Sequence, residues 1–148
     1  MNKEFIKVRC VKDIAVSAIL LLSGSILIGV PSSPSVNIAG FFLIFAGVIF
    51  AFALKSGFKD IQTGERYCKK EHYFQHAQSQ QICSAIASNP EKLDLSEANK
   101  GNSVRLDIYY GKSSRKAYVQ LFEYIPYRYE PCSKMYEYDM DRVSALIK

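Results

Sequence analysis

Four side chains that can bind metal ions lie close together near the middle of the sequence. Cys68, His72, His76 and Cys83 follow the spacing C-x3-H-x3-H-x6-C, and they include both histidines and two of the four cysteines. Two cysteines and two histidines form the tetrahedral site of many structural zinc ions. The pattern lacks the C-x2-C pair of familiar zinc fingers, however, and two packed thiols beside two ordinary histidines would look the same. No cofactor is therefore the first expectation, and zinc is the alternative.

The same residues offer one route to catalysis, in which His72 or His76 activates a cysteine as a nucleophile. Nothing else in the sequence supports it, since there is no nucleophile elbow, no glycine-rich phosphate loop and no Walker motif. The carboxylates of the C-terminal half are spread singly, as on solvated surfaces. We expect a protein that is not an enzyme, with a membrane-bound metal sensor or enzyme as the alternative.

A tyrosine-rich segment near the C-terminus is a second candidate for function. Aromatic residues recur from Phe122 to Tyr136, and Pro126 and Pro131 interrupt them. Tyrosine buries a large area at low entropic cost and keeps a polar tip, so such segments are typical of recognition surfaces. The alternative is that the rings cover the end of a small sheet. The residues expected to form a binding surface are Tyr124, Tyr127, Arg128, Tyr129 and Tyr136.

Two apolar runs in the N-terminal third indicate that the protein is anchored in a membrane. Residues 14–30 and 38–54 contain no Asp, Glu, Lys, Arg or His, and the uncharged residues 31–37 separate them. Each run has 17 residues, or about 25 Å of helix, which is close to the lower limit for crossing a bilayer. The sequence therefore predicts a transmembrane helical hairpin over residues 14–54.

The distribution of charge predicts the orientation of the hairpin. Lysines and arginines lie before the first run and after the second, and the loop between the runs has no charge. By the positive-inside rule both termini are expected in the cytoplasm. A cleaved signal peptide is the competing interpretation, but the first run is longer than a usual signal and no small-x-small cleavage site follows it.

Small residues repeat at intervals of seven within the two runs. Ser17 and Gly24 form one pair in the first run, and Gly40 and Gly47 form another in the second. This repeat places small side chains along one seam, where helices can approach closely. The seams either close the hairpin on itself or leave a surface for another copy or another membrane protein.

The rest of the chain predicts an α+β protein, with a short helical or irregular leader over residues 1–13 and a cytoplasmic domain over residues 55–148. Residues 104–110 alternate apolar and polar, as a half-buried strand does, and residues 116–125 are apolar on both faces, as a central strand is. We expect a small antiparallel sheet with two flanking helices, at residues 75–88 and after a capping Asp139. Residues 55–60 are expected to end the second membrane helix.

The run Val119–Pro131, VQLFEYIPYRYEP, resembles a segment of small uncharacterised two-helix membrane proteins of Bacteroidetes-type bacteria. The resemblance implies a bacterial inner-membrane protein and assigns no activity or site residue. We therefore expect a two-pass inner-membrane protein that presents its tyrosine-rich surface to a protein partner as an accessory or regulatory module. The alternatives are the metal sensor or enzyme, and a self-associating or immunity-type membrane component. No nucleic acid partner is expected.

Overall fold

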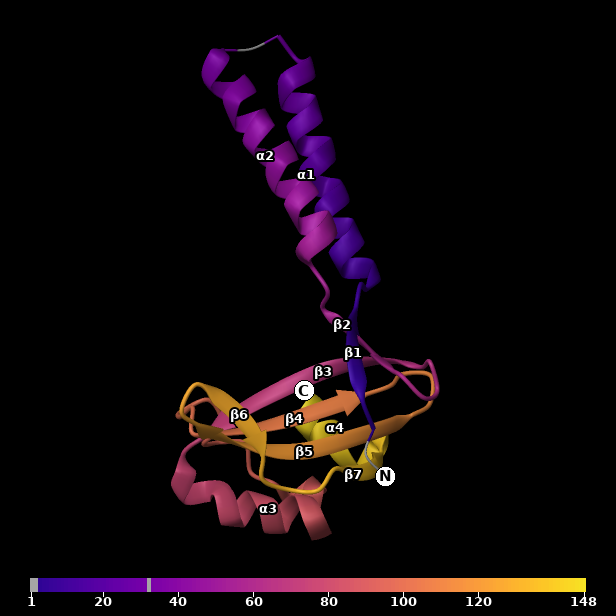
Figure 1. The fold of residues 1–148 in the computed structure, drawn as a ribbon, viewed down its shortest axis with the longest axis vertical. Coiled ribbons are helices and arrows are strands. Elements are labelled where there is room, and N and C mark those ends of the chain that lie inside the picture. Colours follow the sequence, from indigo (N-terminus) through magenta and orange to yellow (C-terminus); the bar gives the residue numbers. More distant parts are fainter. Residues whose placement is uncertain (1–2, 32) are drawn as a thin grey trace. The chain divides into compact units, whose positions relative to one another are not determined.

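The computed structural model describes residues 3–31 and 33–148, and their contacts divide them into two compact units. One unit contains residues 7–57, and the other combines residues 3–6 with residues 58–148. Residues 3–6, the first described residues of the expected leader, belong to this second unit. Figure 1 labels the elements of both units.

Two long helices form the first unit. Helix α1 spans Val11–Gly29 and helix α2 spans Pro34–Ala53, so they have 19 and 20 residues. Both begin earlier than the apolar runs, because Pro34 suits the first turn of a helix and Asp13 is tolerated within the first turn of α1. Each helix is about 30 Å long, the thickness of a hydrocarbon core. Both are long and apolar enough to cross a membrane.

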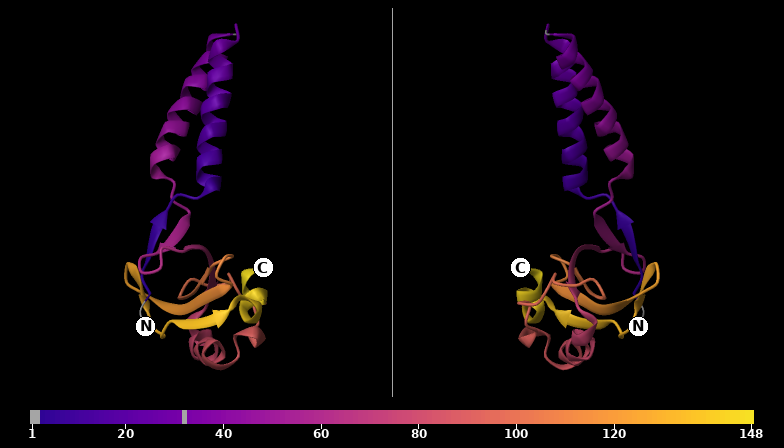
Figure 2. Two further views of the ribbon diagram at one scale, coloured as in Figure 1. Left: turned by 90° about the vertical axis from the view of Figure 1, so that its right-hand side faces the viewer. Right: turned by 90° about the vertical axis from the view of Figure 1, so that its left-hand side faces the viewer.

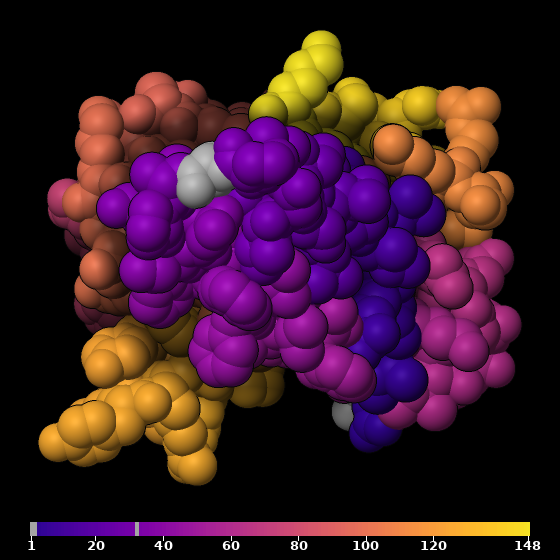
Figure 3. All heavy atoms as spheres, turned by 90° about the horizontal axis from the view of Figure 1, so that it is seen from above, coloured from indigo at the N-terminus to yellow at the C-terminus, as the bar shows by residue number. Residues whose placement is uncertain are grey.

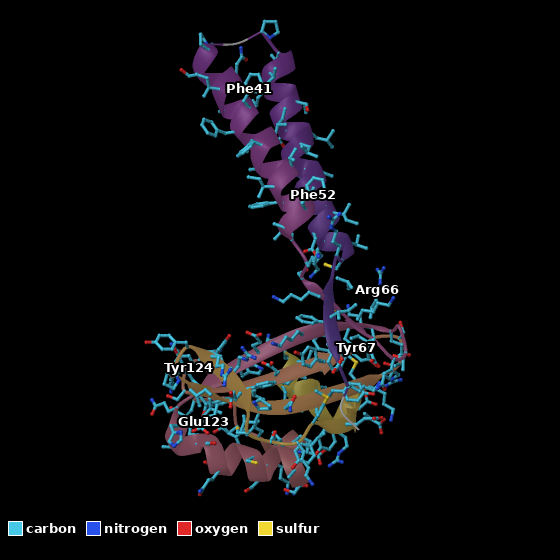
Figure 4. The ribbon with its side chains drawn as sticks, in the orientation of Figure 1. Phe41, Phe52, Arg66, Tyr67, Glu123 and Tyr124 are labelled. Carbon is cyan, nitrogen blue, oxygen red and sulfur yellow. The ribbon has the colours of Figure 1, made fainter. Side chains whose placement is uncertain are left out.

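The small residues of the two seams lie between α1 and α2. Ser17, Gly24, Gly40 and Gly47 are all buried, although most side chains of the two helices are exposed. A side-chain carbon added to Gly24 would lie 2.6 Å from the Gly40 carbonyl oxygen. Many of the larger apolar side chains are exposed, among them Phe41 and Phe52, which Figure 4 labels.

One carboxylate joins the two ends of the hairpin. The Asp13 Oδ2 atom accepts hydrogen bonds from the backbone N–H groups of Cys10 at 3.0 Å and Ser56 at 2.9 Å. The Ser56 hydroxyl donates to Asp13 Oδ1 at 2.6 Å. Asp13 therefore holds the segment that leads into α1 against the segment that follows α2.

Within residues 3–31 and 33–148 the structure contains one seven-stranded antiparallel sheet. Its strand order is β1-β2-β3-β4-β5-β6, and β7 pairs with β5 beyond the end of β6. The strands are β1 (Phe5–Val8), β2 (Gly57–Asp60), β3 (Arg66–Phe74), β4 (Val104–Tyr110), β5 (Lys116–Ile125), β6 (Arg128–Pro131) and β7 (Tyr136–Asp139).

Helices cover one face of this sheet (Figures 1 and 2). Helix α3 (Ser79–Ser88) and helix α4 (Ser144–Ile147) are accompanied by the short 3-10 helices η1 (His76–Gln78), η2 (Pro90–Lys92) and η3 (Met140–Val143). Their apolar residues meet every second residue of β4 and β5 in one core. The fully buried members include Ile86, Leu106, Ile108, Val119, Leu121, Val143 and Leu146.

The α+β class and the two central strands agree with the sequence-based prediction. Strands β4 and β5 have the expected bounds, and β5 lies between β4 and the pair β6 and β7. Three other expectations are wrong. Residues 5–8 form a strand rather than a helical or irregular leader, Gly57–Asp60 forms β2 rather than the end of α2, and the Asp139 side chain makes no capping hydrogen bond.

Candidate functional site

The four candidate metal ligands are spread over three environments. Cys68 is exposed on β3, His76 is exposed at the start of η1, and Cys83 packs against the core from α3. The His76 Nδ1 atom lies 2.8 Å from a carboxylate oxygen of Glu123. In the part of the chain that the structure describes, no group of three or more His, Cys, Asp or Glu side chains could hold a metal ion.

His72 has a structural contact of its own. The ring is buried, and its Nε2 atom lies 2.7 Å from the backbone carbonyl oxygen of Leu146, to which it donates as the Nε2–H tautomer. Residues 72 and 146 are far apart in the sequence, so this contact fastens α4 to β3. His72 therefore contributes to the core under the sheet rather than to a shared site with His76.

The other face of the sheet carries a network of paired charges. Lys69 Nζ lies 2.5 Å from Glu71 and 2.8 Å from the buried Asp107, and Arg105 donates to Asp107 at 3.0 Å. Burial disfavours the charged form of Lys69, but its hydrogen bonds to Asp107 and Glu71 outweigh this and raise the pKa of Lys69. The Tyr73 hydroxyl donates to Glu71 at 2.6 Å. The charges pair with one another across this face, but burial raises the pKa of the Asp107 carboxyl above its ordinary value in spite of the neighbouring Lys69 and Arg105.

Strand β1 brings two residues from the N-terminus onto this face. The Phe5 ring stacks on Tyr109, with 4.2 Å between the ring centroids. Lys3 Nζ lies 2.7 Å from Asp60 Oδ2, and both side chains are almost completely buried. Burial raises the pKa of the Asp60 carboxyl, but hydrogen bonds from Lys3, Thr63 and the Gln62 backbone outweigh it, and the net pKa is lowered.

The tyrosine-rich segment forms the hairpin of β5 and β6. Ile125 pairs with Arg128, so Pro126 and Tyr127 make a two-residue turn. Tyr127 has a φ of +73° and is 98% exposed. A positive φ at the second turn residue is typical of a type II turn, where glycine or asparagine is usual. The turn thus holds a large aromatic side chain in solvent on a strained backbone.

Three of the five predicted surface residues meet at this turn. Tyr124 is half exposed, Tyr127 almost fully exposed, and the Arg128 side chain is also exposed. We call Tyr124, Tyr127 and Arg128 the tyrosine tip. In the space-filling view this end of the β5–β6 hairpin stands out from its own domain (Figure 3), and Tyr124 lies at the edge of the sheet (Figure 4).

The other two predicted residues have packing roles. Tyr129 meets Tyr124 edge-on at 5.2 Å, lies 4.5 Å from the Arg105 guanidinium, and donates a hydrogen bond to the Asn102 carbonyl. Tyr129 therefore packs against Tyr124 of the tip and holds it in place. Tyr136 packs against the core and stacks on Tyr138, and therefore lies away from the tip.

The sequence matches no family model, and neither the search of curated proteins nor the search of solved structures finds a match. The geometry of the chain is therefore the only basis for assigning a function. Among the five residues expected to form a binding surface, those of the tyrosine tip are the most exposed. The Lys3–Asp60 pair was missed, because the pairing of β1 with β2 has no local signal in the sequence.

Proposed function

We propose that this protein is a membrane-anchored interaction module, an accessory or regulatory subunit, that presents the tyrosine tip to a protein partner. One observation carries the proposal: Tyr127 is 98% exposed at a φ of +73°. Glycine or asparagine would suit the turn better, and a polar side chain would expose less apolar area. Strained backbone is concentrated at functional sites, and exposed tyrosine is enriched at interfaces.

The membrane anchor is supported by the length and surface of α1 and α2. Both helices expose large apolar side chains along their whole length, as an aqueous helix pair would not. The lysines and arginines that flank the hairpin, with none in its loop, favour cytoplasmic termini, and the resemblance of residues 119–131 favours the inner membrane of a bacterium. The tip would then act in the cytoplasm.

Site-specific photo-crosslinking in native membranes tests the proposal. A photoreactive amino acid replaces Tyr127 in the full-length chain, and the matched control replaces Gln62, which is also exposed on a turn of the same domain. We expect a single adduct from position 127 and none from position 62. The variant Tyr124→Ala should weaken that adduct at an unchanged thermal midpoint.

Two results would contradict the proposal. Equal adducts from positions 127 and 62 would mean that the tip has no specific neighbour, and no adduct at all from position 127 would mean that it contacts no partner. An adduct of twice the chain mass would instead identify the partner as a second copy of this chain.

A further inference from the structure

A groove opens between α1 and α2 near the end where the chain enters and leaves the hairpin. Its volume is about 210 Å³. The walls are mostly apolar and include Ile14, Ala18 and Leu21 from α1 and Phe50, Ala51 and Leu54 from α2. Pockets that hold drug-sized ligands are usually larger, at roughly 300–1,000 Å³. The groove therefore has room for one narrow apolar chain but not for a helix.

One arginine lines this groove, and two lysines are next in the chain to residues that line it. Arg9 lines it, and its guanidinium lies 5.8 Å from the ring of Phe52. Arg9, Lys12 and Lys55 are exposed, and none of them forms an ion pair with any residue in the described part of the chain. These cations are thus available to an external anion.

The one acid of this unit does not neutralise that charge. Residues 7–57 contain four lysines and arginines and a single acid, Asp13, so their net charge is +3. Asp13 also lines the groove, but its two oxygens accept the hydrogen bonds from Cys10 and Ser56 described above. Its role is to close the base of the hairpin, and the positive charge of Arg9 remains.

We propose that this groove binds one acyl chain of an anionic phospholipid, whose phosphate pairs with Arg9. The inference rests on the membrane placement proposed above, but not on the tyrosine tip. An arginine offers a phosphate two parallel hydrogen bonds, and basic residues at the membrane surface are attracted to anionic lipid. A second copy of the chain is a poorer occupant, because it would bring two units of charge +3 together.

Lipid retention by the full-length protein tests this inference. The protein is incorporated into nanodiscs of equal parts phosphatidylglycerol and phosphatidylcholine, and the lipids that remain bound are counted by native mass spectrometry. We expect the wild type to retain phosphatidylglycerol in preference to phosphatidylcholine. Arg9→Gln should lower that preference about tenfold, while Arg66→Gln, which removes an exposed arginine from β3, should leave it unchanged.

A second pair of variants tests the groove itself. Ala18→Leu adds bulk at a wall residue, and Ala15→Leu adds the same bulk at an exposed position of α1 that does not line the groove. We expect Ala18→Leu to remove most of the retained phosphatidylglycerol and Ala15→Leu to have no effect.

Several outcomes would overturn the inference. Equal losses in Arg9→Gln and Arg66→Gln would indicate diffuse attraction without a site. Unchanged lipid retention with an altered oligomer in Ala18→Leu would assign the groove to a second copy. A chain that inserts but retains both lipids equally would overturn the lipid site alone, whereas a chain that stays soluble without detergent would overturn the membrane placement as well.

Discussion

At the scale of single residues, Tyr127 carries a backbone conformation that its side chain disfavours. A left-handed conformation costs an ordinary residue about 1–2 kcal/mol, whereas asparagine adopts it readily. Tyr127→Ala and Tyr127→Asn remove the same ring. The difference in stability between these two variants therefore measures the backbone strain at position 127. We expect the asparagine variant to be more stable than the alanine variant by about 1 kcal/mol, which is a thermal midpoint about 5 °C higher for a domain of this size.

The matched control for this prediction is Tyr124, which lies in β5 with an ordinary strand conformation. Asparagine is unfavourable in strands, so Tyr124→Asn should be no more stable than Tyr124→Ala. If Tyr127→Asn and Tyr127→Ala melt together, the turn is not strained and the main support for the tyrosine tip is lost. Both Tyr127 variants should lose the partner equally, because binding needs the ring.

The Lys3–Asp60 pair predicts a dependence of stability on pH. Hydrogen bonds hold the pKa of Asp60 below its ordinary value, so its contribution is complete above that value, about 3.9, and is lost as the pH falls through the lowered folded pKa. Burial lowers the pKa of Lys3, but its hydrogen bonds to Asp60 and Tyr118 outweigh this and raise it. The lysine's contribution is therefore complete below its ordinary pKa of about 10.4 and is lost as the pH rises through the raised folded pKa.

Replacing this lysine should consequently matter most between those limits. Lys3→Met leaves a buried carboxylate without its cation, which costs about 2 kcal/mol at pH 7. The difference in unfolding free energy from the wild type should shrink as the pH approaches 3, measured by urea unfolding in detergent. Lys59→Met removes an exposed lysine on β2 and should change nothing at either pH. A difference that is constant with pH would show that the charge of Lys3 has no role.

At the scale of elements, the hairpin depends on the close approach of its glycines. A side-chain carbon on Gly40 would lie 2.8 Å from an Ile28 side-chain carbon and 2.9 Å from the Gly24 carbonyl oxygen. Gly40→Leu should therefore separate α1 from α2 and cost about 1–3 kcal/mol. Gly29→Leu is the control, because an added carbon there meets nothing within 4 Å. In detergent, the helical circular dichroism signal should be lost at a lower temperature in Gly40→Leu than in the wild type, and Gly29→Leu should melt like the wild type. Equal thermal midpoints for the two variants would contradict the close packing of α1 and α2.

Elements with a strong local pattern could be predicted from the sequence, and elements defined by distant partners could not. The alternation of apolar and polar residues gave β4 its correct bounds, apolar residues on both faces gave those of β5, and uncharged runs located α1 and α2. Strand β1 has only four residues, and its partner β2 lies about fifty residues later in the chain, beyond both helices. A local pattern in the sequence therefore cannot show that β1 pairs with β2.

The candidate sites follow the same distinction. Short spacing suggested a metal cluster, but β3 runs to Phe74 and places His72 in the core, whereas His76 follows the end of the strand and is exposed. His72 and His76 are therefore close in the sequence, but their side chains lie in different environments. The turn at Pro126 and Tyr127 was partly readable, because proline favours the first turn position. The positive φ of Tyr127 was not, since tyrosine gives no signal for it.

At the scale of the whole molecule, α1 and α2 are an insertion between two paired strands. The chain leaves β1 for the hairpin and returns directly into β2, which is the neighbour of β1 in the sheet. A side-chain carbon on Gly57 would lie only 3.1 Å from the Val8 carbonyl oxygen, so the two ends of the insertion touch. Insertions whose ends are close can often be removed without unfolding the domain around them.

Replacing residues 9–56 by Asn-Gly should therefore leave a folded sheet domain. Asn-Gly favours the two-residue turn that joins antiparallel strands, and β1 and β2 would become such a hairpin. We expect a protein that is soluble without detergent and melts cooperatively. The comparison is a chain that begins at residue 57, which lacks Phe5 and Lys3 and so uncovers Tyr109 and leaves Asp60 unpaired. Losing that packing and that ion pair should cost about 4 kcal/mol. Equal stability of the two proteins would mean that β1 is not part of the domain, and the N-terminal residues would then belong to the anchor alone.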